Sequence, residues 1–338
     1  MDTTIKFAVI GCGHIGKRHA SIIEENPATE LVALVDILPR EKLSIEKFNV
    51  PFFPSLEDYL ANRPNADVVI IATPNALHSM QAILCMEKGK HVVIEKPMAI
   101  KTSDAKKVIN KAREVERHVF AVMQNRYSPP SAWIKEILTK GLLGKIFMIQ
   151  VNCYWNRDNR YYLKNNWHGK KELDGGTVFT QFSHFIDIIY WLFGDIHDIQ
   201  ARLKSFNHGV LTEFEDSGTV QFTLENGAMG SLNFSTSVWD RNMESTITII
   251  AENGTVKIGG QYMDKVEYCH IKDYTIPSLR VTNPGNEYGG YAGSASNHEY
   301  VIQNVVDVLK GKAPIAATAE EGLAVVDMIE RIYAAANK

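Results

Sequence analysis

The first third of the chain alternates short apolar runs with longer amphipathic segments. The apolar runs, rich in Val and Ile, cover 5–10, 31–35, 68–72, 91–94 and 119–122. Their apolar residues are continuous rather than alternating, which is typical of strands covered on both faces. Helical spacing fills the segments between them, at 14–26, 39–48, 76–88 and 102–116. Strands that alternate with helices predict a doubly wound parallel sheet, an α/β Rossmann domain over residues 1–123.

The pattern changes after about residue 125. A helix is expected over 131–140, a strand over 146–155 and a second helix over 178–192. Alternating strands follow at 217–225, 228–237, 245–251 and 254–258, and Asn226-Gly227 and Asn253-Gly254 are typical hairpin turns. Helices return over 297–310 and 318–336. Residues 124–338 are therefore predicted to form an α+β domain with an open, mostly antiparallel sheet. Its C-terminal helices belong to it or pack back on the first domain.

Composition narrows the class of protein. A length of 338 residues suits two domains, and a net charge of −3 leaves no basic excess for nucleic acid. The 4 cysteines have no CxxC spacing, which predicts neither a metal site nor a disulfide framework. No signal peptide or membrane-length apolar run is visible. We expect a cytoplasmic protein with reduced thiols and no membrane, nucleic-acid or metal partner.

A glycine-rich turn joins the first apolar run to the first helix. It is Gly11-Cys12-Gly13-His14-Ile15-Gly16, and Asp36 follows at the end of the second run. In this strand–turn–helix context the spacing is the dinucleotide fingerprint. The helix N-terminus binds the pyrophosphate, and the aspartate accepts hydrogen bonds from the adenine ribose. A carboxylate there repels a 2′-phosphate, so we predict NAD as cofactor, with Arg40 close enough to temper that preference.

Glu95-Lys96-Pro97 ends the fourth apolar run. Ligands of open parallel sheets bind outside the carboxyl ends of the strands, so Lys96 is expected beside the nicotinamide. Partial burial and a nearby cationic ring favour the neutral amine. Lys96 is then able to take the proton of a substrate hydroxyl as hydride leaves the carbon. The alternative is an ordinary surface lysine at a strand end.

A second group of candidates follows the pair Gly175-Gly176. In a helix, residues 177, 180, 181 and 184 share one face, which presents Thr180, Gln181 and His184 on an otherwise apolar helix. This polar face predicts a catalytic histidine, although a lone histidine on such a helix is commonly a core residue. We expect Lys96 and His184 to meet in one cleft beside the nicotinamide.

Four motifs in this order resemble the Gfo/Idh/MocA oxidoreductases, a family named for glucose–fructose oxidoreductase and inositol dehydrogenase. They are the glycine turn, Thr73-Pro74-Asn75 with His78, Glu95-Lys96-Pro97, and the GG…H helix that ends in Trp191-Leu192-Phe193-Gly194. The resemblance spans essentially the whole chain and implies Lys96 and His184 as the catalytic pair. On both grounds together, the expected NAD contacts are Gly11, Gly13, His14, Ile15, Gly16, Asp36, Ile37, Thr73, Pro74, Asn75, His78, Glu95, Lys96 and Gln124.

One position departs from the family pattern. Many members carry an Asp four residues before the helix histidine, where this chain has Thr180. Segments 152–157 and 167–169, with the sequence TQFSH, resemble instead the bacterial dehydrogenases that oxidise C3 of UDP-N-acetylglucosamine or its uronic acid. That resemblance implies a 3-keto nucleotide sugar made for surface-polysaccharide synthesis. The expected substrate contacts are Arg157, Arg160, Tyr161, Trp167, Thr180, Gln181, His184 and Ser296.

Several alternatives stay open. The basic, aromatic segment 154–171 either binds the nucleotide sugar or is a solvated loop. The long segment 273–296, with the glycine-rich run 288–298, either closes over the sugar or simply precedes the next helix. The resemblance implies a dimer or tetramer, so Val220, Phe222, Leu224, Leu232 and Phe234 face either a second subunit or the domain's own helices. A dehydrogenase of a free sugar, inositol or glycoside, and a non-catalytic NAD-binding regulator, are the other functions considered.

Overall fold

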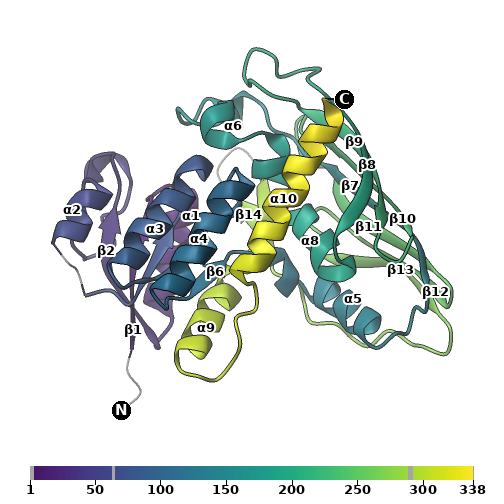
Figure 1. Cartoon of the computed structure of the whole chain (residues 1–338), viewed down its shortest axis with the longest axis horizontal. Coiled ribbons are helices and arrows are strands. Elements are labelled where there is room, and N and C mark those ends of the chain that lie inside the picture. The colour runs from purple at the N-terminus through teal and green to yellow at the C-terminus, as the bar shows by residue number, and fades with distance from the viewer. Residues whose placement is uncertain (1–3, 63–64, 288–291, 338) are drawn as a thin grey trace. The chain divides into compact units, whose positions relative to one another are not determined.

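The computed structural model describes residues 4–62, 65–287 and 292–337 (Figure 1). The chain divides into two compact units: Met1–Met123 with His298–Val326, and Gln124–Asn297 with Asp327–Lys338. The sequence analysis counted 298–338 with the second domain while allowing its helices to pack back. In the structure, residues 298–326 belong to the first unit.

The first unit contains a six-stranded sheet in the order β3-β2-β1-β4-β5-β6, with every described pair parallel. Its strands are β1 Ile5–Ile10, β2 Thr29–Val35, β3 Phe52–Phe53, β4 Val68–Ile71, β5 His91–Ile94 and β6 Val119–Ala121. The order reverses between β1 and β4, so this is the doubly wound Rossmann arrangement that the sequence predicted. All four residues of β4 are buried, as expected for a strand covered on both faces.

Helices of the first unit follow the strands closely. They are α1 His14–Glu25, α2 Leu56–Ala61, α3 His78–Glu87, α4 Thr102–Glu114 and α9 His298–Leu309, with short turns η1 Arg40–Lys42 and η2 Asn75–Leu77. Helix α10, Ala319–Ala336, starts in the first unit and ends in the second.

The helix predicted over 39–48 is wrong. Only Arg40–Lys42 forms a helical turn, because Ser44 adopts a left-handed φ of 52° that ends it. The Arg40 guanidinium donates to the carbonyl oxygens of Phe48 and Val50. These bonds hold the segment as a loop although its apolar residues repeat at helical intervals.

The second unit is built on a seven-stranded sheet in the order β13-β12-β11-β7-β10-β9-β8. Its strands are β7 Ile146–Tyr154, β8 Ile196–Lys204, β9 Ser217–Leu224, β10 Met229–Ser235, β11 Glu244–Ala251, β12 Gly254–Gly259 and β13 Lys265–Ile271. Only the β7–β10 pair is parallel among them. The predicted open, mostly antiparallel sheet is therefore confirmed. A separate hairpin pairs β14 Gly285–Glu287 with β15 Ala292–Ala295.

The second unit also contains helices. They include α5 Pro129–Thr139, α6 Asn159–Tyr162, α7 Lys171–Asp174 and α8 Ser183–Phe193, with the short turns η3 Gln124–Tyr127 and η4 Val178–Phe182. Phe182 packs on Phe234 of β10 with ring centroids 5.0 Å apart. Residues 220, 222, 224, 232 and 234 are all buried. They therefore face the unit's own core and not a second subunit, the other alternative given for these residues.

Among the described residues, no helix combines the length and the apolar composition needed to cross a membrane.

Candidate active site

The glycine turn after β1 fits a dinucleotide. Gly11 has a φ of 88°, and a Cβ on it would lie 2.5 Å from the Ala72 carbonyl oxygen. A Cβ on Gly16 would lie 1.7 Å from the Gly11 carbonyl oxygen, whereas a Cβ on Gly13 would meet nothing within 4 Å. Helix α1 starts after Gly13 with no side-chain cap. The open space and the first backbone N–H groups of α1 together suit a pyrophosphate.

Asp36 is fixed beside this turn. Its carboxylate accepts hydrogen bonds from the backbone N–H groups of Cys12, at 2.7 Å, and Leu38, at 2.9 Å. The neighbouring Ile37 is 87% exposed, an apolar surface suited to an adenine ring. The Arg40 guanidinium is held by the backbone carbonyls of Phe48 and Val50, as described above. These residues fit NAD better than its 2′-phosphorylated form.

The Cys12 thiol inside the turn is not a nucleophile. Burial, followed by the charge of Asp36, raises the pKa of Cys12 to about 12. Its Sγ instead lies 3.6 Å from the Val35 carbonyl oxygen as a weak donor. The thiol therefore has a packing role in the turn.

The loops after β4 and β5 are joined at the same edge of the sheet. The buried His78 ring lies between two carbonyl oxygens, 2.8 Å from that of Pro97 through Nδ1 and 2.8 Å from that of Thr73 through Nε2. Thr73 donates its hydroxyl to Gln81 at 2.6 Å. Pro74 precedes η2, and Asn75 is its buried first residue. His78 thus links the two loops that carry the Thr73-Pro74-Asn75 and Glu95-Lys96-Pro97 motifs.

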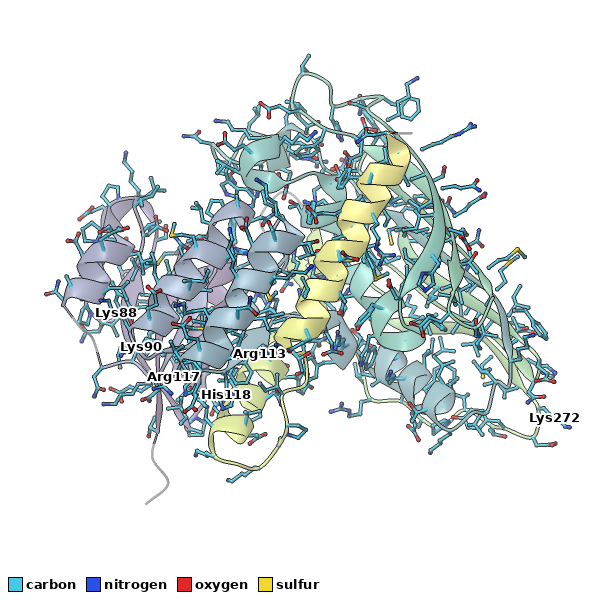
Figure 2. The ribbon with its side chains drawn as sticks, viewed as in Figure 1. Lys88, Lys90, Arg113, Arg117, His118 and Lys272 are labelled. Atoms are coloured by element: carbon cyan, nitrogen blue, oxygen red, sulfur yellow. The ribbon has the colours of Figure 1, made fainter. Side chains whose placement is uncertain are left out.

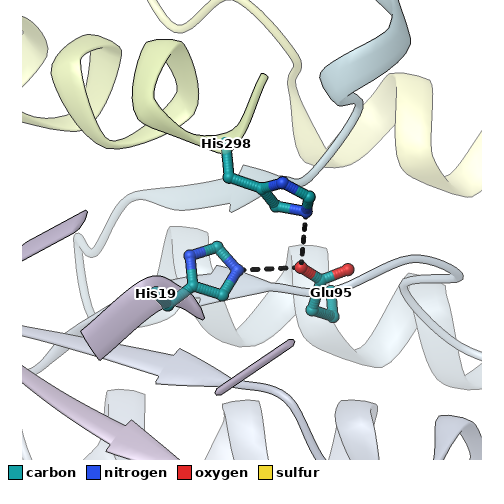
Figure 3. A group of neighbouring side chains, drawn as sticks. All are labelled: His19, Glu95 and His298. Atoms are coloured by element: carbon teal, nitrogen blue, oxygen red, sulfur yellow. Dashed lines mark hydrogen bonds and ion pairs between the residues drawn. The ribbon is translucent and has the colours of Figure 1, made fainter. Parts of the chain in front are cut away.

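Glu95 and Lys96 directly follow β5. Lys96 is half-buried immediately after β5, and the Lys96–Pro97 peptide is cis. Glu95 is buried, and its carboxylate lies beside His19 and His298 (Figure 3). The sequence analysis expected Glu95 at the cofactor. The structure places its side chain in this histidine cluster.

The glycine pair of the second unit leads into an unusual turn. Gly175 ends α7 with a φ of 90°, and Gly176 has a φ of 130°. Val178–Phe182 is a π-helical turn rather than the start of a regular helix. Such turns are rare and occur frequently at functional sites. Thr180 and Gln181 therefore lie in the π-helical turn and not on a regular helical face shared with His184. His184 is the second residue of α8 and is buried.

A buried carboxylate lies next to Thr180. The Thr180 hydroxyl donates to the side chain and the backbone oxygen of Asp174. Asp174 is 1% exposed, and its carboxylate also accepts from the Gly169 backbone N–H at 2.9 Å. The sequence shows the missing carboxylate at position 180 but does not predict that Asp174 lies beside it. No spacing rule indicates it, because a non-helical pair of glycines separates the two residues.

Arg157, Gln181 and Tyr161 form one buried network. Gln181 accepts from Arg157 Nε at 2.7 Å and donates its amide to the Tyr161 hydroxyl at 2.6 Å. The guanidinium also lies 4.8 Å from the Trp155 ring centroid. The structure thus brings together three of the predicted substrate residues, Arg157, Tyr161 and Gln181.

Arg160 and Trp167 lie outside this network. Arg160 is exposed and forms ion pairs with Asp158 and Asp240, and its proximity lowers the pKa of Asp158. Trp167 packs edge-on against His168, whose ring stacks on Tyr161 at 4.1 Å between centroids. His168 is therefore an additional aromatic contact of the network that the sequence analysis did not select.

The segment expected as a long loop contains the β14–β15 hairpin. Tyr288, Gly289, Gly290 and Tyr291 of its glycine-rich run lie outside the described residues. The Gln124 amide donates to the Ser294 hydroxyl at 3.0 Å, and the Ser296 carbonyl oxygen accepts from Asn283 at 2.9 Å. Gln124 and Ser296, predicted for cofactor and substrate, therefore lie in a polar cluster that ties η3 to the hairpin.

A buried ion pair anchors α8. Arg126 of η3 makes a bidentate contact to Asp187, and both side chains are at most 5% exposed. Asp187 lies three residues after His184 and so fixes the helix that carries it. The sequence analysis missed this pair, since neither residue belongs to a motif it used.

Comparison with known proteins identifies the class of this fold and site. Residues 5–123 match the family model of the oxidoreductase family with an NAD-binding Rossmann fold, and residues 132–257 match the GFO/IDH/MocA C-terminal domain. The chain is 31% identical to the WlbA dehydrogenase from Bordetella pertussis, whose crystal structure contains NADH and UDP-GlcNAcA. That match covers 99% of this chain and 97% of the other, with a TM-score of 0.86. This chain belongs to the Gfo/Idh/MocA oxidoreductase family.

Other similar proteins are also dehydrogenases. The WlbA dehydrogenase from Chromobacterium violaceum, in complex with the same two ligands, is 30% identical, with a TM-score of 0.88 over 100% of this chain and 95% of the other. Glucose-6-phosphate 3-dehydrogenase from Bacillus subtilis is 24% identical over 86% of this chain and 85% of its own length. The chain is accordingly an NAD-dependent dehydrogenase of the sugar type, with its NAD-binding domain in residues 5–123.

Proposed function

We propose that this chain oxidises the C3 hydroxyl of the sugar in a UDP-N-acetylglucosamine-type nucleotide sugar, with the uronic acid as the preferred form. The product is a 3-keto nucleotide sugar for surface-polysaccharide synthesis. The observation that carries the proposal is the similarity to two WlbA dehydrogenases, at about 30% identity over nearly the full length of each chain.

Each candidate residue has a defined role in this reaction. NAD, when bound, accepts the hydride from C3. Lys96 takes the proton of the C3 hydroxyl, and His184 orients that hydroxyl or shares the base role. The buried Arg157 is held in place by Gln181. A guanidinium is a suitable partner for the substrate's carboxylate or diphosphate, which supports a nucleotide sugar acid over a neutral polyol.

The direct test is a product assay. Purified protein is incubated with NAD and UDP-N-acetylglucosaminuronate, UDP-N-acetylglucosamine, free N-acetylglucosamine, glucose 6-phosphate or myo-inositol. Mass spectrometry then detects the 3-keto product even when tightly held NADH hides turnover in an absorbance trace. We expect product only with the UDP-linked sugars. If only the free sugars or inositol gave product, the protein would be a dehydrogenase of those compounds instead. If no compound reduced bound NAD, a non-catalytic NAD-binding protein would be favoured.

The role of Lys96 is tested with Lys96→Met. We expect turnover to fall at least about a hundredfold, which is the lower end of what a general base contributes. NAD binding, measured by thermal shift, should be nearly unchanged. Lys101→Met is the matched control, because Lys101 is exposed five residues further on. Full activity in Lys96→Met would exclude Lys96 as the base.

A further inference from the structure

Three buried side chains of the first unit converge on one point. His19 comes from α1, Glu95 follows β5, and His298 is the first residue of α9 (Figure 3). Their exposed fractions are 0%, 6% and 0%. Of the residues that the structure describes, these three form the group of metal-binding side chains with all donor atoms within 4.8 Å of one another.

The distances suit a small cation. His19 Nε2 lies 2.8 Å from Glu95 Oε1, and His298 Nε2 lies 3.6 Å from the same oxygen. Ligands at the 2.0–2.1 Å bond lengths of tetrahedral zinc lie about 3.3 Å apart. The two observed separations fall on either side of that value. All the donor atoms lie within 4.8 Å of one another, so side-chain adjustments at the ångström scale would place both imidazoles and the carboxylate around one ion.

The cluster also has unsatisfied polar atoms. Within the described chain, both ring nitrogens of His298 and Nδ1 of His19 are buried without a hydrogen-bond partner. Such buried groups are rare in native proteins and call for an unseen partner. An ion that accepts the Nε2 lone pair of His298 supplies one.

The chemistry of the donor set agrees with this picture. A buried carboxylate and two imidazoles form a donor set that zinc binds in proteins.

We propose that His19, Glu95 and His298 bind one divalent transition-metal ion of the Zn²⁺ class. The site is enclosed by the protein, so the ion is structural: it ties the helix after the glycine turn to the end of β5 and to the start of α9. The sequence analysis predicted no metal, because these ligands come from three distant segments and follow no spacing motif. The inference does not depend on which sugar the enzyme oxidises.

The first experiment measures metal content in the full-length protein. Protein purified without metal affinity is stripped with a chelator, reloaded with Zn²⁺ or Co²⁺, freed of excess ion and measured by mass spectrometry of the elements. We expect close to one ion per chain and the intense visible bands of tetrahedral Co²⁺. His298→Gln should weaken Co²⁺ binding by at least about tenfold, the loss that even outer-shell changes cause in metal sites. His118→Gln, an exposed histidine of the same unit, should bind like the wild type.

A second measurement keeps the proposal testable if His298→Gln does not fold. X-ray absorption on the Zn²⁺-loaded wild-type protein should show nitrogen and oxygen neighbours with the multiple scattering of two imidazoles. Sulfur neighbours, or water ligands alone, would identify an adventitious ion and overturn the site. Failure of the wild-type protein to retain an ion after reloading would also overturn the site. The cluster would then be explained by the His19–Glu95 hydrogen bond and a buried water.

Discussion

A histidine at the start of β5 is held neutral by its surroundings. His91 stacks on His118 with ring centroids 5.0 Å apart, and its Nδ1 accepts the His118 backbone N–H at 2.9 Å. Figure 2 labels His118 and Arg117 at this end of the strands. Burial first, and then the positive charges of His118 and Arg117, lowers the pKa of His91 to about 4.

This shift predicts part of the acid sensitivity of the fold. A histidine whose pKa is depressed on folding gives stability that is present above its unfolded pKa of about 6.5 and is lost as pH falls toward 4. Over that window the free energy of unfolding should fall as the pH falls, because His91 takes up a proton more readily in the unfolded chain. His91→Asn keeps an acceptor near Nδ1 and cannot titrate, so urea titrations from pH 7 to 4 should show a shallower acid limb.

His270→Asn is the control for this experiment. His270 is exposed on β13, so its replacement should leave the acid limb unchanged. Equal slopes for wild type and His91→Asn would show that His91 is not a source of the acid sensitivity.

At single residues, the sequence predicted what local spacing determines. The glycine turn and Asp36 are separated by one βα unit, and the Asp36 carboxylate accepts a hydrogen bond from Cys12 within that turn. Asp174 and the cluster of His19, Glu95 and His298 were not predicted. Their partners come from elements that are distant in the sequence, and only tertiary packing brings them together.

At the scale of elements, the turn between α7 and α8 contains Gly176, and Tyr333 of α10 packs directly on this glycine. Gly176 has a φ of 130°, and a Cβ there would lie 2.1 Å from the Tyr333 hydroxyl. That hydroxyl donates to Glu215 at 2.6 Å and accepts from the Val178 backbone N–H at 3.2 Å. The end of α10 thus packs against the turn that precedes the candidate catalytic histidine.

Gly176→Ala should therefore destabilise the protein. The alanine adds backbone strain and displaces Tyr333 from its hydrogen bonds, for a combined cost of about 2–4 kcal/mol. Gly141→Ala is the matched control, since Gly141 has a φ of 68° with nothing within 4 Å of the new Cβ. It should cost only about 1 kcal/mol from the backbone alone. Equal losses in urea-induced unfolding of the two variants would show that the contact with Tyr333 contributes nothing.

Three of the strands that the sequence missed are edge strands. Strands β8 and β13 are the two edges of the seven-stranded sheet, and β3 is an edge of the six-stranded sheet. An edge strand has a neighbour on one side only and commonly carries charged residues. β13 reads KVEYCHI and β8 reads IHDIQARLK, with mostly half-buried or exposed positions. The apolar pattern of β8 and β13 was therefore too weak to predict them, whereas the central strands, and the fully buried edge strand β6, were predicted within one or two residues.

At the scale of the whole molecule, the first unit is discontinuous in sequence. The backbone N–H of Ala121 donates to the Ala317 carbonyl oxygen at 3.1 Å, and the Asn26 amide donates to Gln303 at 3.2 Å. His19 of α1 and His298 of α9 also pack edge-on, with centroids 5.2 Å apart. Residues from beyond the second unit therefore complete the core around the helix that follows the glycine turn.

This arrangement predicts how cofactor binding spreads through the chain. A ligand present at 100 times its Kd stabilises the unit that binds it by about 2.7 kcal/mol, which slows amide exchange through full unfolding about a hundredfold. Hydrogen exchange with and without NAD should therefore slow α9 by the same factor as α1, although the two helices are far apart in sequence. The internal reference is α5 of the second unit. If α9 follows α5 while α1 alone is slowed, residues 298–326 do not unfold with the NAD-binding core, and the contacts of Gln303 and Ala317 contribute little to its stability.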